Sequence, residues 1–128
     1  MPTEASAPNL PRNFVRPCVL LLLREHPAHG YDLLERLRTF GFSPSDPGRL
    51  YRALRGLEAE GLVRSAWEAS ESGPNRRIYE LTREGMEELH EQAHALVVAG
   101  AALERFLIRY EEFVALRRHS SGVDRVPG

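Results

Sequence analysis

The sequence contains a single cysteine, Cys18, among its 128 residues. A disulfide within the chain and a metal site built from several cysteines are therefore excluded. Cys18 stands among apolar residues, so we expect it to be a small core side chain. A chain with so little cysteine is typical of a reducing compartment, and we expect a cytoplasmic protein.

The chain has no apolar run long enough to cross a bilayer. The run CVLLLL at residues 18–23 is too short for this. Pro11 and Pro17 precede it, and HPAHGY follows it where a signal peptide would need small residues for cleavage. We therefore expect neither export nor a membrane partner.

Lysine is absent, and all 17 basic residues are arginine, which we attribute to the codons of a GC-rich genome. The sequence also lacks GxGxxG, P-loop and Gly-x-Ser-x-Gly motifs, and Cys18 has no evident partner base. His90 and His94 have the spacing of metal ligands on a helix, but no third ligand accompanies them. We therefore predict that the protein is not an enzyme and that it holds no metal or cofactor.

Length and composition allow one small core and one long appendage, since 42% of the residues are hydrophobic and 27% are charged. The net charge is -1, yet twelve of the 17 arginines lie within residues 12–83, and residues 84–112 are rich in glutamate. The local field matters more than this total. Residues 1–10 and 118–128 have few large apolar groups and are expected to be a disordered arm and tail.

Two helices are predicted before residue 41. The first covers residues 14–24 and is apolar on all sides, which is typical of a buried helix. The second covers residues 30–40 and is expected to end at Gly41. His29, just before it, is expected to have a capping or packing role. The inner face of the second helix is predicted to comprise Tyr31, Leu33, Leu34 and Leu37.

A third helix has clear boundary signals. Asp46 is a suitable N-cap, Pro47 suits the first turn, and Gly61 suits the left-handed position after the end. At about 100° per residue, Leu50, Ala53, Leu54 and Leu57 share one face. The opposite, exposed face suits phosphates and base edges because it carries Gly48, Tyr51, Arg52 and Arg55.

Two strands and a turn follow this helix. In residues 63–68 and 78–81 the side chains alternate between two faces, as they do in strands. Residues 70–75, with Gly73 and Pro74, are predicted to form the hairpin tip. Arg76 and Arg77 stand where the tip rejoins the strand, from which they could hold a phosphate or enter the minor groove. Trp67 is expected in the core at the base of this hairpin, or alternatively in an effector cavity.

Thr82 is expected to cap a last helix, over residues 83–117. Apolar or small residues recur along it in steps of three and four, a heptad pattern over about 45 Å that no small domain could cover alone. A second copy of the chain is the simplest partner. The residues of this seam are Met86, Leu89, Ala93, Leu96, Gly100, Leu103, Leu107, Tyr110 and Val114.

These elements predict a mainly α fold with a two-stranded wing: a winged helix-turn-helix over residues 11–82, followed by a dimerisation helix. Such a domain places a helix in the major groove of double-stranded DNA and a hairpin beside it. The competing interpretation is a winged helix used as a protein-interaction module, with the heptad helix as the binding element. Arg52, Arg55, Arg76 and Arg77 would favour DNA if they formed one positive surface.

The chain resembles the PadR family of transcriptional regulators in the stretches HGYDLLERL, PGRLYRALRGLEAEGLV and GPNRRIYELTREG. They correspond to the second helix, the recognition helix, and the wing with its return into the last helix. The single long last helix resembles the short PadR subfamily. LPRNFVRPCVLLLL, with FGF and DPG before the third helix, is similar to the branch of poly-beta-hydroxybutyrate-responsive repressors.

The resemblance implies a homodimer that binds a roughly palindromic operator, represses nearby genes and responds to a small-molecule or nucleotide effector. The DNA-contacting tyrosine of the family falls on Tyr51, and the start of its recognition helix falls on Gly48 and Arg49. Most members have a small residue at the position of Arg49.

Overall fold

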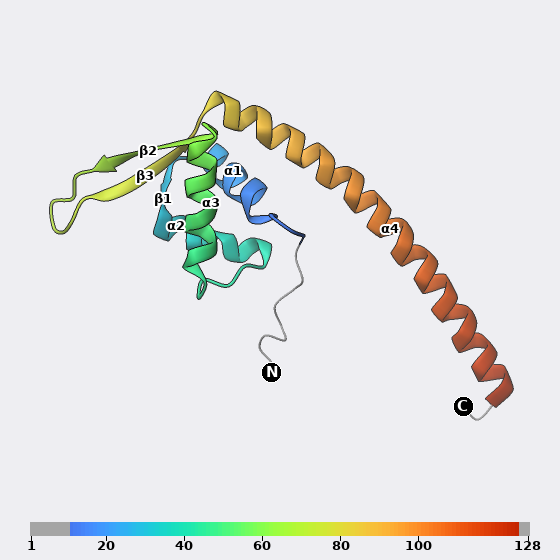
Figure 1. Cartoon of the computed structure of the whole chain (residues 1–128). Coiled ribbons are helices and arrows are strands. Elements are labelled where there is room, and N and C mark those ends of the chain that lie inside the picture. The colour runs from blue at the N-terminus through green and yellow to red at the C-terminus, as the bar shows by residue number, and fades with distance from the viewer. Residues whose placement is uncertain (1–10, 126–128) are drawn as a thin grey trace. The chain divides into compact units, whose positions relative to one another are not determined.

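The structure, a computed structural model, describes the backbone of residues 11–125 and the side chains of residues 11–117. The arm predicted over residues 1–10 lies outside them. Figure 1 shows the elements. In chain order they are α1 (Val15–Glu25), β1 (Ala28–His29), α2 (Gly30–Arg36), the short 3-10 helix η1 (Leu37–Phe40), α3 (Pro47–Ala59), β2 (Val63–Glu68), β3 (Arg76–Leu81) and α4 (Arg83–Arg125). The chain divides into two compact units, with the boundary after Gln92.

The core of the first unit lies among α1, α2, α3 and the sheet. Leu20, Leu33, Leu50, Leu54 and Leu57 are the largest of its fully buried side chains. All four residues predicted for the inner face of α3 are buried. The mainly α fold with a wing is therefore confirmed. The prediction that the apolar residues bury α1 on all sides was wrong at Leu21, which is exposed.

The second helical segment spans the predicted residues, but it changes from α2 to the tighter η1 after Arg36. Gly41 follows with a φ of 95°, the left-handed conformation predicted for the stop. Leu33 and Leu37 are buried as expected. The placement of Tyr31 on the inner face was wrong, because its side chain is 69% exposed.

The sheet has three antiparallel strands in the order β1-β3-β2, one more than the sequence predicted. β2 and β3 form the expected hairpin, with Trp67 opposite Arg77 and Glu68 opposite Arg76. The additional strand, β1, lies on the side of β3 opposite to β2 and pairs Ala28 with Tyr79. His29 is therefore part of a strand as well as the residue just before α2.

Thr82 joins the sheet to α4 as predicted. Its hydroxyl accepts a hydrogen bond from the Gly85 amide at 3.0 Å and donates one to the carbonyl of Gly61 at 2.7 Å. The Thr82 amide also donates to the carbonyl of Leu62 at 3.2 Å. The end of α3, the start of β2 and the start of α4 are thus held together in one junction.

The first turns of α4 belong to the core of the first unit. Leu89 is only 8% exposed and packs in the same apolar cluster as the helices, with Met86 against it. The assignment of Leu89 to a dimer surface was therefore wrong, because its own domain already covers it.

From Ala93 onward α4 forms the second unit, and its backbone is helical as far as Arg125, past the boundary predicted at residue 117. Most of its large apolar side chains are exposed within one chain; Leu103, for example, is 62% exposed. Across the described part of the chain, no helix has both the length and the apolar character to span a membrane.

Candidate nucleic-acid interface

The exposed face of α3 is the centre of the candidate site. Arg49, Tyr51, Arg52 and Arg55 are all exposed there, and Gly48 is half-buried in the first turn. Their positions follow from the opposite face, because the four buried residues of α3 leave only this side for solvent. The structure therefore brings the predicted α3 residues together on one surface of the first unit.

Tyr51 packs closely against the start of α2. A Cβ atom on Gly30 would lie 2.4 Å from the Tyr51 hydroxyl oxygen and 2.8 Å from its ring, so only glycine leaves room for this ring. The Tyr51 side chain nevertheless remains 37% exposed. Gly30 thus positions Tyr51 at the edge of the core, with part of its side chain facing outward.

Arg49 is held beside the start of α3. Its Nε lies 3.8 Å from Asp46 Oδ2, and its guanidinium lies 5.8 Å from the centroid of the Phe42 ring. Asp46 occupies the predicted N-cap position, but its side chain makes no capping hydrogen bond. The expected capping contact was therefore wrong, and the Asp46 carboxylate partly neutralises Arg49 instead.

The wing arginines have different surroundings. Arg76 is exposed at the start of β3. Arg77 Nε donates to the Ser65 hydroxyl at 2.9 Å, and that hydroxyl donates to Glu58 of α3 at 2.7 Å. Burial raises the pKa of Tyr79, while the nearby Arg77 acts in the opposite direction. Arg77 therefore ties the wing to α3, whereas Arg76 is turned to solvent.

Trp67 lies on the surface of the wing. Its side chain is 64% exposed, and the Arg77 guanidinium lies 5.0 Å from the centroid of the ring. The expectation of a core tryptophan was wrong, because the hairpin extends past the helices and offers nothing to bury the ring there except Arg77. Trp67 and Arg77 form a stacked pair on the sheet face directed toward α3.

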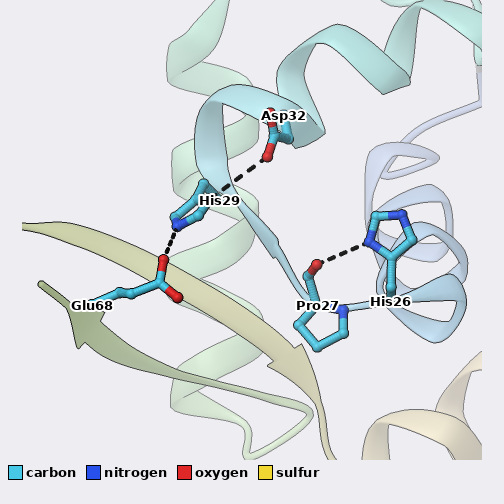
Figure 2. A network of polar contacts seen from close by, with 5 residues as sticks. All are labelled: His26, Pro27, His29, Asp32 and Glu68. Atoms are coloured by element: carbon cyan, nitrogen blue, oxygen red, sulfur yellow. Dashed lines mark hydrogen bonds and ion pairs between the residues drawn. The ribbon is translucent and has the colours of Figure 1, made fainter. Parts of the chain in front are cut away.

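Figure 2 shows a contact that the sequence did not predict. His29 Nε2 lies 2.7 Å from Glu68 at the end of β2, and its Nδ1 lies 3.6 Å from Asp32 of α2. His29 occupies the N-cap position of α2 without a side-chain capping bond. Its ring instead connects β1, α2 and the outer strand of the wing. A histidine before a glycine gave no indication of a partner 39 residues away.

Residues 19–91 match the model of the transcriptional regulator PadR-like family. The chain belongs to this family. The resemblance to the family is thereby confirmed, and so is the prediction that the protein is not an enzyme, because the family is one of transcriptional regulators. The short subfamily and the branch of poly-beta-hydroxybutyrate-responsive repressors stay predictions.

Known transcriptional regulators are similar to much of this chain. Transcriptional regulator Rv3488 of Mycobacterium tuberculosis is 38% identical over 89 residues, which cover 66% of this chain and 81% of that protein. A PadR family regulator from Eggerthella lenta is 33% identical, with a TM-score of 0.59, over 70% of this chain and 80% of its own. Bacillus subtilis PadR, solved in complex with operator DNA, is 25% identical, with a TM-score of 0.58, over 65% of this chain and 48% of its own.

Two further arginines of this PadR-like chain border the α3 surface and were not selected from the sequence. Arg12 precedes α1 and Arg16 lies in its first turns, and both line a cavity together with Arg49 and Arg52. The only signal for them was the concentration of arginine in residues 12–83, because their distance from α3 in the sequence conceals their proximity in the fold.

Proposed function

We propose that the protein binds double-stranded DNA as a homodimer, represses genes beside a palindromic operator, and is released or tuned by a small-molecule effector. The observation that carries the proposal is the exposed face of α3, where Tyr51, Arg52 and Arg55 stand together opposite a fully buried face. Arginine on an exposed recognition helix can bind guanine edges or phosphates. The complex of Bacillus subtilis PadR with operator DNA supports this use of the fold.

DNA binding is tested with a labelled duplex from the intergenic region upstream of the gene. We expect Arg52→Ala or Arg55→Ala to weaken specific binding by about 1 to 3 kcal/mol if the residue reads a base. Arg64→Ala is the matched control, because Arg64 pairs with Glu80 at 2.7 Å and alternates with Ser65, which faces α3. The proposal fails if the wild-type dimer shows no binding in low salt, a result that would favour the protein-interaction module.

The proposed dimer rests on an apolar stripe on the second unit. A repeat of seven residues aligns Leu96, Leu103 and Tyr110, and beside them Gly100, Leu107 and the half-buried Val114. Phe106 and Phe113 widen the stripe and are exposed in the single chain. Burying one large apolar side chain stabilises an assembly by about 1.5–3 kcal/mol, so water is a poor environment for this surface. A second copy offers a stripe of the same repeat.

A charge placed within the stripe tests the dimer. In a twofold assembly Leu103→Glu acts twice, so we expect the dissociation constant to rise by about 100-fold or more. Val97→Glu is the matched control, since Val97 is also exposed but lies on another side of α4. Sedimentation at micromolar concentration distinguishes the variants. Equal dissociation constants for both would refute this surface, and a monomeric wild type would refute the homodimer.

Two such recognition helices should contact DNA about 34 Å apart, one helical turn, as in other dimeric helix-turn-helix proteins. Protection of two half-sites with this spacing, together with reduced transcription from the adjacent promoter in vitro, is the expected result. Protection of a single half-site, or increased transcription, would contradict the palindromic repressor.

An effector site is supported by a cavity of about 520 Å³ between the end of α1 and the start of α4. Leu23, Leu81 and Met86 give it apolar walls, and its volume is within the range of small-molecule sites. Trp67 is not among its lining residues. A ligand here would regulate DNA binding only by favouring one conformation over another. Met86→Trp should fill the cavity and abolish the response to an effector while operator binding persists.

A further inference from the structure

A second cavity lies where the start of α1 meets the start of α3. Its volume is about 460 Å³, and it is lined by the segment Pro11–Arg16 with Phe42, Arg49, Arg52 and Ala53. Four of the lining side chains are arginine and none is acidic. Such a concentration of guanidinium groups around one cavity is suited to an anion.

The segment before α1 is held against the cavity by its own turn. The Phe14 amide donates to the carbonyl of Pro11, and the Arg16 amide donates to the carbonyl of Asn13, both at 3.1 Å. Asn13 has a φ of 61°, a left-handed conformation that asparagine tolerates better than most residues. Phe14 then stacks on Phe42 with 6.0 Å between the ring centroids. Arg12 is thus placed beside α3 by local structure.

The charge of this cluster is only partly balanced. Arg16 pairs with Glu60 at 2.7 Å and Arg49 with Asp46 at 3.8 Å, and neither acid lines the cavity. Within residues 11–117, no acidic oxygen lies within 4.0 Å of the guanidinium nitrogens of Arg12 or Arg52. Two guanidinium groups therefore share the cavity with no paired carboxylate among residues 11–117, although bringing like charges together costs free energy.

We propose that this cavity binds a phosphate group of the DNA backbone, next to the bases that α3 contacts. The guanidinium fork matches the oxygens of a phosphate. In helix-turn-helix complexes the first turns of the recognition helix meet base edges while a preceding helix crosses the backbone. Arg49 and Arg52 belong to those first turns of α3, and Arg12 lies before α1, so one strand of the duplex passes the cavity. This inference rests on the proposed DNA-binding function.

The salt dependence of binding tests the contact, because each phosphate neutralised contributes about 0.9 to the slope of log K against log salt concentration. In a homodimer Arg12→Ala removes two contacts, so the slope should fall by about 1.8. The loss should be the same on the operator fragment and on a mixed-sequence duplex, since a phosphate carries no sequence information. Arg12→Lys should restore most of the slope, and Arg64→Ala should leave it unchanged.

The outcomes separate this inference from the proposed function. An unchanged slope for Arg12→Ala, or a loss confined to the operator fragment, overturns the phosphate contact while DNA binding itself stands. If the wild type binds no duplex, titration with pyrophosphate decides. Saturable binding of pyrophosphate that Arg12→Ala abolishes would assign the cavity to a free phosphate compound and refute the contact with a DNA phosphate. No binding of pyrophosphate would refute the anion site itself. Circular dichroism melting confirms that each variant is folded.

Discussion

Replacing Gly85 with alanine should destabilise the first unit through a collision with backbone. An added Cβ atom would lie 2.1 Å from the carbonyl oxygen of Leu62 and 2.6 Å from Cδ1 of Leu81. The leucine side chain can rotate, but the carbonyl is fixed by the Thr82 amide at 3.2 Å, and the Leu62 amide donates to Leu57 at 2.9 Å. The first turn of α4 would therefore have to move by about 1 Å to restore van der Waals distances.

The expected magnitude combines opposing terms. Overpacking costs about 1–3 kcal/mol, and disturbing the Thr82 cap adds about 1 kcal/mol. Alanine returns up to about 1 kcal/mol through its higher helix propensity. The free energy of unfolding should thus fall by about 1–3 kcal/mol, which lowers the melting temperature of a domain of this size by about 5 to 20 °C.

Melting by circular dichroism measures the effect, with every variant placed in the Leu103→Glu background so that the proposed dimerisation does not contribute. Gly73→Ala is the control, because the nearest atom to an added Cβ atom there is the Ser70 hydroxyl oxygen at 3.9 Å. It should change the stability by less than about 0.5 kcal/mol. If Gly85→Ala melts at the same temperature as Gly73→Ala, the collision with Leu62 is not real.

Two further predictions concern Tyr51 and Cys18. Gly30→Ala should push the Tyr51 ring toward solvent, because the new Cβ atom would lie 2.4 Å from its hydroxyl oxygen. The affinity for the operator should then drop to that of Tyr51→Ala. An unchanged affinity would show that the position of Tyr51 does not depend on Gly30. Burial raises the pKa of Cys18 from 9.0 to about 12, so a thiol reagent at pH 8 should label it only after unfolding, and the folded state should lose stability as the pH rises above 9. Rapid labelling of native protein would contradict this.

Local signals predicted much of the fold. Pro47 and Gly61 marked the ends of α3 because proline and glycine have strong backbone preferences at those positions. Thr82 indicated the start of α4 because its hydroxyl can accept a hydrogen bond from a free amide of the first turn, here that of Gly85. The exposed and buried faces of α3 followed from helical periodicity alone.

The errors concern properties that depend on partners distant in the sequence. β1 has only two residues, too few for any periodicity, and exists because β3 offers it hydrogen bonds. Trp67 and Tyr31 are apolar enough for a core, but the fold provides no neighbour to cover them. Leu89 fits the heptad repeat, and a repeat cannot show whether the covering surface belongs to the same chain or to another.

The candidate site could be predicted only where its residues belong to one element. The residues of α3 share one helix, so their common face could be calculated from spacing. Arg12 and Arg16 lie beside that face because of the turn before α1 and the tertiary packing of α1 on α3, which includes the stacking of Phe14 on Phe42. Arg77 was predicted as a wing contact, but the structure also gives it a partner in Ser65 that the sequence could not indicate.

The junction at Thr82 determines how a movement of α4 is transmitted to α3. The Thr82 amide and hydroxyl bind the carbonyls of Leu62 and Gly61, so the start of α4 cannot rotate independently of them. A rotation of the start of α4 is therefore transmitted to Gly61, in the turn that directly follows α3. A compound bound in the cavity proposed beside Met86 would therefore act on α3 through these hydrogen bonds, with no linker in between.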